Sequence, residues 1–164
     1  QDVISYQKGL EHCLNEDVDV VYIDEIKKDF DKLVPQILEL ASGNSLVILE
    51  MNADTVIRVI EKILSSNNNS KSSESIRYNL SDVLAGIICQ RLIPKRGGGM
   101  AMANEILIAT QPVKSLIREG KIFQLESILE TSRGEGMTSM KKAIDELVSM
   151  GTINKDEADK LNLA

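Results

Sequence analysis

The spacing of hydrophobic residues divides the first part of the chain into alternating predicted helices and strands. Hydrophobic residues recur at the period of an amphipathic helix in residues 6–14 and again in residues 30–40. Within residues 18–24 and 45–51 they are consecutive, and each run is short, which is typical of strands buried on both faces. Two such strands joined by a helix predict a parallel β-α-β unit.

Two residues modify the prediction for the helix in residues 30–40. Pro35 lies in its middle and has no amide hydrogen to donate, so we expect a kink or a later start. Gly43 follows the last hydrophobic residue and is expected to end the helix as a C′ glycine, in the left-handed conformation.

Helical and polar patterns alternate in the next segment. Asn52 or Asp54 can cap a helix over residues 56–64. The polar, low-complexity sequence of residues 65–75 predicts a mobile loop. The helical period of residues 76–88 predicts a long helix.

A glycine-rich turn predicts a β-hairpin. Two hydrophobic segments flank the turn Lys95–Gly99, and Pro94 should lie at a strand end. Beyond Thr110 the patterns are helical only, and Asn154 with Glu157 resembles a capping box that begins the last helix.

The predicted fold class is therefore α/β. A parallel sheet and a β-hairpin are expected in residues 1–110, and an all-helical part in residues 111–164.

Composition and charge limit the partners and the location. The formal net charge is −6, aromatic residues make up 3%, and Trp is absent, which argues against nucleic acid as a partner. Cys13 and Cys89 lack the spacing of a metal site and are predicted to be reduced core residues. No hydrophobic run is long enough for a membrane span and no signal peptide opens the chain, so we expect a cytoplasmic protein without a transmembrane segment. Because a helical pattern starts almost directly after Gln1, we expect a piece of a longer chain.

Asp24 and Glu25 lie where the first predicted strand ends. Such a pair can hold a magnesium-bound water and polarise an attacking water in phosphoryl transfer, but a strand that simply ends in solvated acids is an alternative. The phosphate-binding pattern GxxxxGKS/T is absent, and the glycines of "KRGGGMAMA" fit a hairpin turn instead.

Two stretches carry a resemblance to a known family. They are "GGGMAMANEILIAT" and "LIREGKIFQLESILETSRGEGMTSMKKAIDELVSMGTINKDEA". With the segment "DVISYQKGLEHCLNEDVDVVYIDE", they make the chain resemble a divergent C-terminal half of PilT-like ATPases, the type IV pilus retraction motors of the secretion ATPase superfamily. The resemblance implies a RecA-like sheet fragment, the Walker B side of a P-loop NTPase.

The resemblance also implies roles for single residues. Glu25 falls on the Walker B glutamate and is the predicted catalytic residue, Asp24 is the predicted metal residue, and Asn52 takes the place of the His-box histidine in the nucleotide site. Glu11 and Asn15 stand where the family carries arginines, so these positive charges are missing.

A third implied site is the retraction motif in the helix after Thr110. Val113, Leu116 and Ile117 are expected to pack, while Lys114, Ser115 and Arg118 are expected to be free for a partner or a neighbouring subunit. The whole motif comprises Val113, Lys114, Ser115, Leu116, Ile117, Arg118 and Glu119.

The implied function is that of a motor part which couples ATP binding and hydrolysis to pilus retraction and twitching motility. The alternative is a non-catalytic pseudo-ATPase or assembly module of a pilus or secretion machine. The resemblance implies ATP and Mg²⁺ for a full-length member, with neither bound by these residues alone. It also implies a homo-oligomeric ring, a hexamer, that contacts a pilus platform protein at the inner face of the cell membrane.

Overall fold

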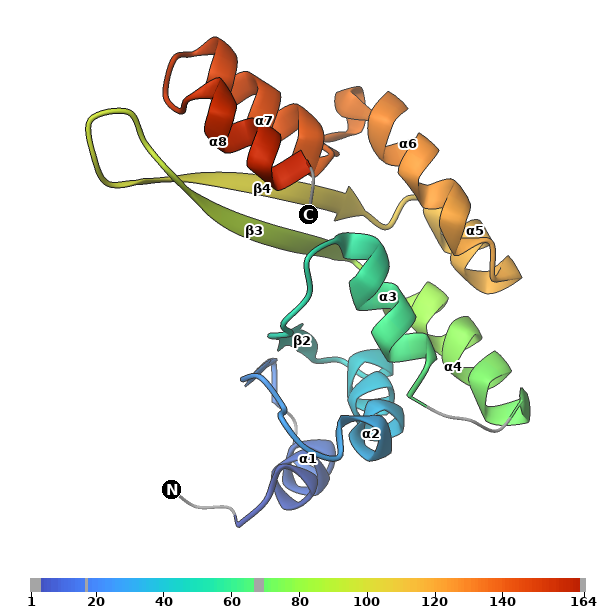
Figure 1. The fold of residues 1–164 in the computed structure, drawn as a ribbon. Helices are drawn as coiled ribbons and strands as arrows, with labels where there is room; N and C mark the ends of the chain where they lie inside the picture. Colours follow the sequence, from blue (N-terminus) through green and yellow to red (C-terminus); the bar gives the residue numbers. More distant parts are fainter. Residues whose placement is uncertain (1–3, 17, 67–69, 163–164) are drawn as a thin grey trace.

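Two small β-sheets organise the structure (Figure 1). The computed structural model describes residues 4–16, 18–66 and 70–162. Strands β1 (Val20–Ile23) and β2 (Leu46–Leu49) pair in parallel, and strands β3 (Gly86–Pro94) and β4 (Met100–Ile108) form an antiparallel hairpin. The predicted α/β class, with a parallel pair, a hairpin and a helical C-terminal part, is confirmed.

The predicted β-α-β unit is present. Helix α1 (Tyr6–Asn15) precedes it, and helix α2 (Phe30–Ser42) connects β1 to β2. Pro35 lies inside α2, which begins at Phe30, so the predicted late start is wrong. Gly43 directly follows the end of α2, as predicted, but its φ of −82° is not the left-handed conformation usual for a C′ glycine. Its amide donates to the Leu40 carbonyl (3.2 Å), and β2 begins shortly afterwards, at Leu46.

The next two helices differ from the prediction in the cap of the first and in the start of the second. Helix α3 (Val56–Leu64) is capped by Thr55, whose hydroxyl accepts a hydrogen bond from the Arg58 amide (3.2 Å), and not by Asn52 or Asp54. Helix α4 (Ser70–Val83) begins inside the segment predicted as a mobile loop. Polar residues lower helix propensity only slightly, so packing of the later turns can extend the helix backwards. Residues 67–69 of the predicted loop lie outside the described residues.

Helix α4 also ends earlier than predicted. Ile87 and Ile88 belong to β3 and not to the helix. A spacing of four residues fits one face of a helix and also one face of a strand, so Leu84 and Ile88 cannot distinguish the two. Cys89, predicted as a core residue, lies buried in β3.

The hairpin turn agrees with the prediction. Gly97, Gly98 and Gly99 all have positive φ, between 78° and 104°, which residues with a side chain rarely adopt. Pro94 is the last residue of β3, at the strand end where its missing donor costs nothing.

The residues after the hairpin are helical, as predicted, except for one β-bridge between Ile106 and Thr138. The Asn154 side chain, predicted to cap the last helix, accepts a hydrogen bond from the Arg96 guanidinium in the hairpin loop and so links two segments. The helices are α5 (Gln111–Glu119), α6 (Leu125–Thr131), α7 (Met140–Ser149) and α8 (Lys155–Asn162), with 3₁₀ turns at Ile122–Gln124 and Arg133–Glu135.

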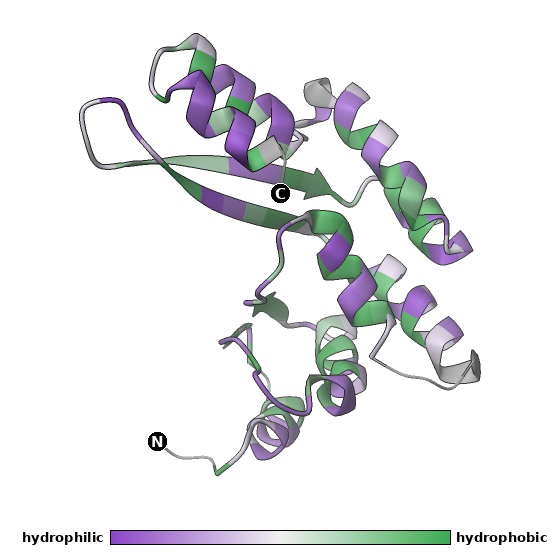
Figure 2. Ribbon diagram, viewed as in Figure 1, coloured by the Kyte–Doolittle hydropathy of each residue, from purple (hydrophilic) through white to green (hydrophobic). Residues whose placement is uncertain are grey.

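Two hydrophobic clusters hold the elements together. The larger one joins α2, α3 and α4 to the hairpin and to the C-terminal helices, and the smaller one joins α1, β1 and α2. Figure 2 shows hydrophobic stretches along both hairpin strands and a hydrophilic stretch in their connecting loop. The larger cluster contains residues from both sides of residue 110, so the two predicted domains share one hydrophobic core. The domain boundary at residue 110 stays a prediction.

One face of the parallel sheet is bare. Helices α1 and α2 cover the face that carries Val21 and Ile23. Residues on the opposite face are about half exposed, so the prediction of strands buried on both faces is wrong for this chain. Their exposed fractions are 58% for Val20, 62% for Tyr22, 54% for Leu46 and 48% for Ile48. Within the described residues, no helix has the length and hydrophobicity needed to cross a membrane.

Candidate functional site

A cavity of about 440 Å³ lies where both parallel strands end. Glu25 follows β1, and the segment 50–52 follows β2. The start of α2 and the end of α3 supply the remaining lining residues. Ligands of open α/β sheets commonly bind at the carboxyl ends of parallel strands, so this cavity is the candidate site.

The cavity brings together two of the residues predicted from sequence. Glu25 and Asn52 both line it, although they are distant in the sequence. They meet because β1 and β2 run in parallel and in register, from Val20 opposite Leu46 to Ile23 opposite Leu49.

The lining of the cavity is acidic. The carboxylates of Glu25, Asp31 and Glu50 face one cation, Lys62, among the described residues that line it. The Lys62 ammonium donates a hydrogen bond to the backbone carbonyl of Asn52, which ties α3 to the segment after β2. This wall does not favour phosphates by itself, because negative groups outnumber positive ones.

Asp24 lies apart from this cavity. One of its carboxylate oxygens accepts a hydrogen bond from the Glu25 amide (2.7 Å), and Asp24 lines a second cavity of about 530 Å³ between α1 and β1. Successive residues of an extended chain point to opposite sides, which separates Asp24 from Glu25.

Asp24 is the residue predicted to contact magnesium. In the described ranges, no group of three or more His, Cys, Asp and Glu residues is placed to hold a metal ion. Magnesium in nucleotide sites usually needs only one or two protein carboxylates besides water and phosphate oxygens, so the metal role of Asp24 stays a prediction.

Glu50, Asp31 and Lys62 are lining residues that the sequence analysis missed. Glu50 directly follows β2, so the same strand-end argument that selected Glu25 could have found it. Its carboxylate accepts a hydrogen bond from the Tyr22 hydroxyl (2.5 Å), and this bond raises the pKa of Tyr22. Lys62 carried no signal in the sequence, because only the packing of α3 brings it to the cavity.

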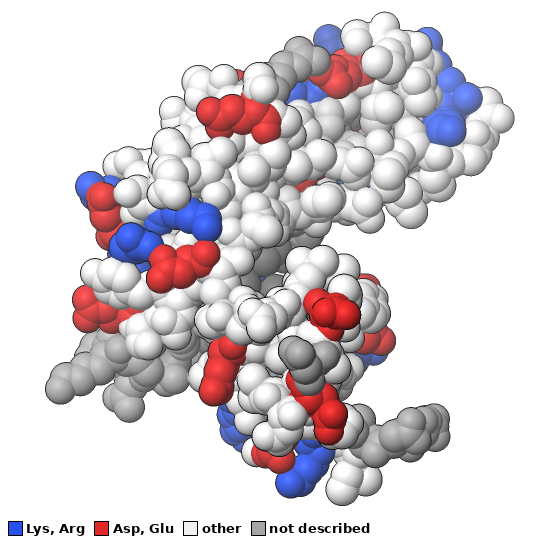
Figure 3. All heavy atoms as spheres, turned by 180° about the vertical axis from the view of Figure 1, so that it is seen from behind, with Lys and Arg blue, Asp and Glu red and all other residues white. Residues whose placement is uncertain are grey.

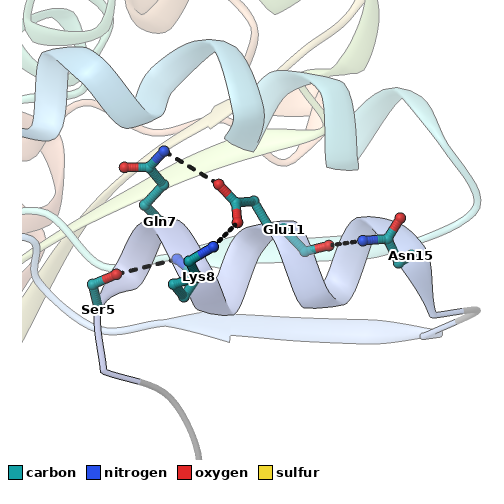
Figure 4. A network of polar contacts seen from close by, with 5 residues as sticks. All are labelled: Ser5, Gln7, Lys8, Glu11 and Asn15. Atoms are coloured by element: carbon teal, nitrogen blue, oxygen red, sulfur yellow. Dashed lines mark hydrogen bonds and ion pairs between the residues drawn. The ribbon is translucent and has the colours of Figure 1, made fainter.

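Glu11 and Asn15, which the resemblance predicts to stand in place of two arginines, make contacts within α1 (Figure 4). The Glu11 carboxylate accepts hydrogen bonds from Lys8 (3.0 Å) and Gln7 (3.2 Å), and the Lys8 bond holds the pKa of Glu11 below its usual value. The side-chain amide of Asn15 donates to the backbone carbonyl of Glu11 (2.8 Å). The Ser5 hydroxyl caps the helix by accepting a hydrogen bond from the Lys8 amide (3.2 Å). These side chains stabilise α1 itself and supply no positive charge to a neighbour.

The helix of the predicted retraction motif, α5, is packed as expected on one face only. Val113 and Ile117 are fully buried and Leu116 is half-buried, whereas Ser115 and Glu119 are exposed.

The two cations of this motif are not free, contrary to the sequence expectation. Lys114 donates to the Asp82 carbonyl (3.0 Å), and Arg118 donates to the Ser81 hydroxyl (3.2 Å) and pairs with the Asp82 carboxylate. Its guanidinium also lies over the Tyr78 ring, 5.8 Å from the ring centre. Both cations therefore bind residues at the end of α4. The sequence pattern had predicted that this helix continues to residue 88.

Figure 3 shows how the charged side chains are distributed on one face of the molecule. Acidic and basic side chains there are interspersed, and neither sign forms a broad continuous patch. A basic stripe that could follow a phosphate backbone is not present on this face.

Comparison with known proteins gives a consistent result. The chain is 30% identical over 159 residues to a twitching motility protein of Neisseria gonorrhoeae, and 28% identical over 158 residues to the type IV pilus retraction ATPase PilT of Pseudomonas aeruginosa. A crystal structure of the pilus retraction motor PilT with bound ADP matches 98% of the chain with a TM-score of 0.86 and 31% identity. By sequence and by fold, the chain is PilT-like. It corresponds to the C-terminal part of such an ATPase, as the resemblance predicted.

The match has two limits. The chain spans 45% of the Pseudomonas protein, 42% of the Neisseria protein and 44% of the PilT structure, so it covers less than half of each. The ATPase DotB of Legionella pneumophila matches with a TM-score of 0.84 at 13% identity, which supports the fold alone. No family model matches the chain.

Proposed function

We propose that this chain is part of a PilT-like ATPase motor that couples ATP binding and hydrolysis to type IV pilus retraction and twitching motility. The observation that carries the proposal is the match of 98% of the chain to the retraction motor PilT, at a TM-score of 0.86. The cavity at the carboxyl ends of β1 and β2, with Glu25 in its wall, supports it.

In this proposal Glu25 is the residue that orients and polarises the attacking water. Asn52 contacts the nucleotide from the end of β2. The cavity has a surplus of carboxylates, so the positive charges that hold the phosphates must come from residues outside these 164 or from a neighbouring subunit. The PilT structure with bound ADP is consistent with a nucleotide as the ligand.

The assembly and location follow from the same resemblance. We propose a homo-oligomeric ring, a hexamer, on the cytoplasmic face of the cell membrane, where it contacts a pilus platform protein. Helix α5, anchored to α4 by Lys114 and Arg118, is the proposed contact element.

A second function is favoured by the contacts of Glu11 and Asn15. Where the family carries arginines, these two residues contact their own helix and bring one negative and one neutral side chain. Loss of two positive charges weakens the stabilisation of a phosphoryl transition state. The chain would then be a pseudo-ATPase or assembly module of the pilus machine.

A chimera distinguishes these two functions. This chain replaces the aligned segment of the Pseudomonas PilT, and the purified chimera is assayed for ATP hydrolysis and for twitching in a strain without its own PilT. A motor part restores hydrolysis, and Glu25→Gln lowers the rate by about a hundredfold or more because the water loses its base. Glu126→Gln, on the exposed face of α6, is the matched control and should leave the rate unchanged.

A chimera that assembles but hydrolyses no more ATP than its Glu25→Gln variant supports the pseudo-ATPase. A chimera in which Glu25→Gln retains the full rate contradicts the catalytic assignment of Glu25.

A further inference from the structure

Glu105 is a buried carboxylate in the middle of β4. Only 6% of its surface is exposed, and it lies opposite Cys89 in the hairpin register. Burial raises the pKa of the Cys89 thiol to about 11, with the Glu105 charge as a second cause, so this neighbour stays uncharged. None of the ion pairs among the described residues includes Glu105.

The two carboxylate oxygens of Glu105 bind two different helices. Oε1 accepts a hydrogen bond from the Val56 amide (2.7 Å), and Oε2 accepts one from the Met140 amide (3.1 Å). Val56 is the first residue of α3 and Met140 is the first residue of α7. A first-turn amide has no partner within its own helix, and the positive end of the helix dipole attracts a carboxylate. Two helix N-termini therefore stabilise one buried negative charge.

The remaining caps of the two helices are local and alike. The Thr55 hydroxyl accepts from the Arg58 amide (3.2 Å) in α3, and the Ser139 hydroxyl accepts from the Lys142 amide (3.4 Å) in α7. Each helix thus has one cap from its own preceding residue and one from Glu105. Only the second cap is shared.

The two helices belong to different parts of the molecule. Helix α3 carries Lys62, which lines the candidate cavity and binds the carbonyl of Asn52. Helix α7 packs on β4 among the C-terminal helices (Figure 1). A displacement of the start of either helix breaks one of the two bonds to Glu105.

We propose that Glu105 is a positioning residue that couples the wall of the candidate cavity to the C-terminal helices by capping α3 and α7 at once. The role of this coupling in a motor rests on the proposed function, in which the candidate cavity is the nucleotide site. The coupling itself does not depend on a nucleotide, so it can be tested in its absence.

Amide hydrogen exchange of the 164-residue chain, resolved by residue, tests the coupling. In Glu105→Gln the side chain keeps its size but retains one accepting oxygen, and its NH₂ group faces one of the two helix amides. We expect exchange at the start of α3 and at the start of α7 to rise together by roughly fivefold or more, while exchange in α6 stays unchanged. Glu126→Gln is the matched control and should change neither helix start.

Single-helix variants keep the proposal testable if Glu105→Gln does not fold. Thr55→Val removes the local cap of α3 only, and Ser139→Ala removes that of α7 only. If Glu105 couples the helices, Thr55→Val also raises exchange at Met140, and Ser139→Ala also raises it at Val56. Effects confined to the helix that was changed overturn the proposal. So does a Glu105→Gln variant that affects only one helix or raises exchange equally throughout the chain.

Discussion

Ile117 and Arg118 are neighbours on α5 in opposite environments. Ile117 is 0% exposed and belongs to the larger hydrophobic cluster, whereas the Arg118 side chain is 45% exposed in its pair with Asp82. Burial of an aliphatic side chain contributes several times more than an exposed ion pair. At the scale of single residues, α5 is therefore held by Val113 and Ile117 and oriented by Arg118.

Alanine substitutions of Ile117 and Arg118 can be compared directly, because both residues lie on α5. Ile117→Ala should lower the free energy of unfolding by about 2–5 kcal/mol, because it leaves a cavity in the core. Arg118→Ala should lower it by about 1 kcal/mol or less, because the ion pair is half exposed. Urea unfolding of the chain followed by circular dichroism measures both changes.

The same two variants, placed in the chimera with PilT, separate packing from function. Arg118→Ala should reduce twitching although the protein remains folded, because α5, the proposed contact element, loses the bonds that hold it against the end of α4. Full motility of this variant would show that the helix serves only as a scaffold.

Helix α5 has a defined end, which matters at the scale of the element. Gly120 adopts a φ of 72°, its amide donates to the Ile117 carbonyl (3.1 Å), and the Lys121 amide donates to the Leu116 carbonyl (2.9 Å). This is the Schellman arrangement, which requires a left-handed residue after the helix. A Cβ at Gly120 would also lie 2.9 Å from the guanidinium of Arg77.

Gly120→Ala and Gly43→Ala form a matched pair. Gly120→Ala should destabilise the chain by about 1–2 kcal/mol relative to Gly43→Ala, because only the first places a side chain at positive φ. Gly43 has a φ of −82°, and a Cβ there would lie 3.4 Å from the Leu40 carbonyl oxygen, an ordinary contact distance. Equal melting temperatures for the two variants would contradict the assignment of strain to Gly120.

Sequence patterns predicted most elements but not all of their ends. The hairpin was predicted because three glycines and Pro94 permit few other conformations. The end of α4 at Val83 was not predicted, because the spacing of Leu84 and Ile88 fits a helix and a strand equally. The cap of α3 and the start of α4 were misplaced because capping and packing, which need the tertiary structure, outweigh local propensity.

At the scale of the whole molecule, the chain exposes hydrophobic sheet surface on both sheets. Val20, Tyr22, Leu46 and Ile48 share one face of the parallel pair, because Val20 pairs with Leu46 and Tyr22 with Ile48. On the hairpin, Leu92 is 65% exposed. Contiguous exposed hydrophobic surface of this kind favours association.

We expect the chain to associate with further copies or to aggregate at high concentration. Light scattering should report a mass above that of the monomer, and the paired substitutions Val20→Thr and Ile48→Thr should reduce it, because Thr keeps strand propensity while it removes hydrophobic surface. Lys27→Ser, an exposed polar change just after β1, is the control. A monomer at high concentration would contradict the prediction, as would equal association of the Thr variants.

The sequence by itself determined the alternation of helices and strands, the hairpin turn and the resemblance to PilT-like ATPases, because these depend on local spacing and on short motifs. Only the tertiary structure decided that Glu25 meets Asn52 and Lys62 while Asp24 lies elsewhere, and that Lys114 and Arg118 bind α4. The same holds for Glu105, whose two bonds join residues separated by 49 and 35 positions. The physical reason is that such contacts depend on the register of the strands and the packing of the helices, which no local pattern of residues specifies.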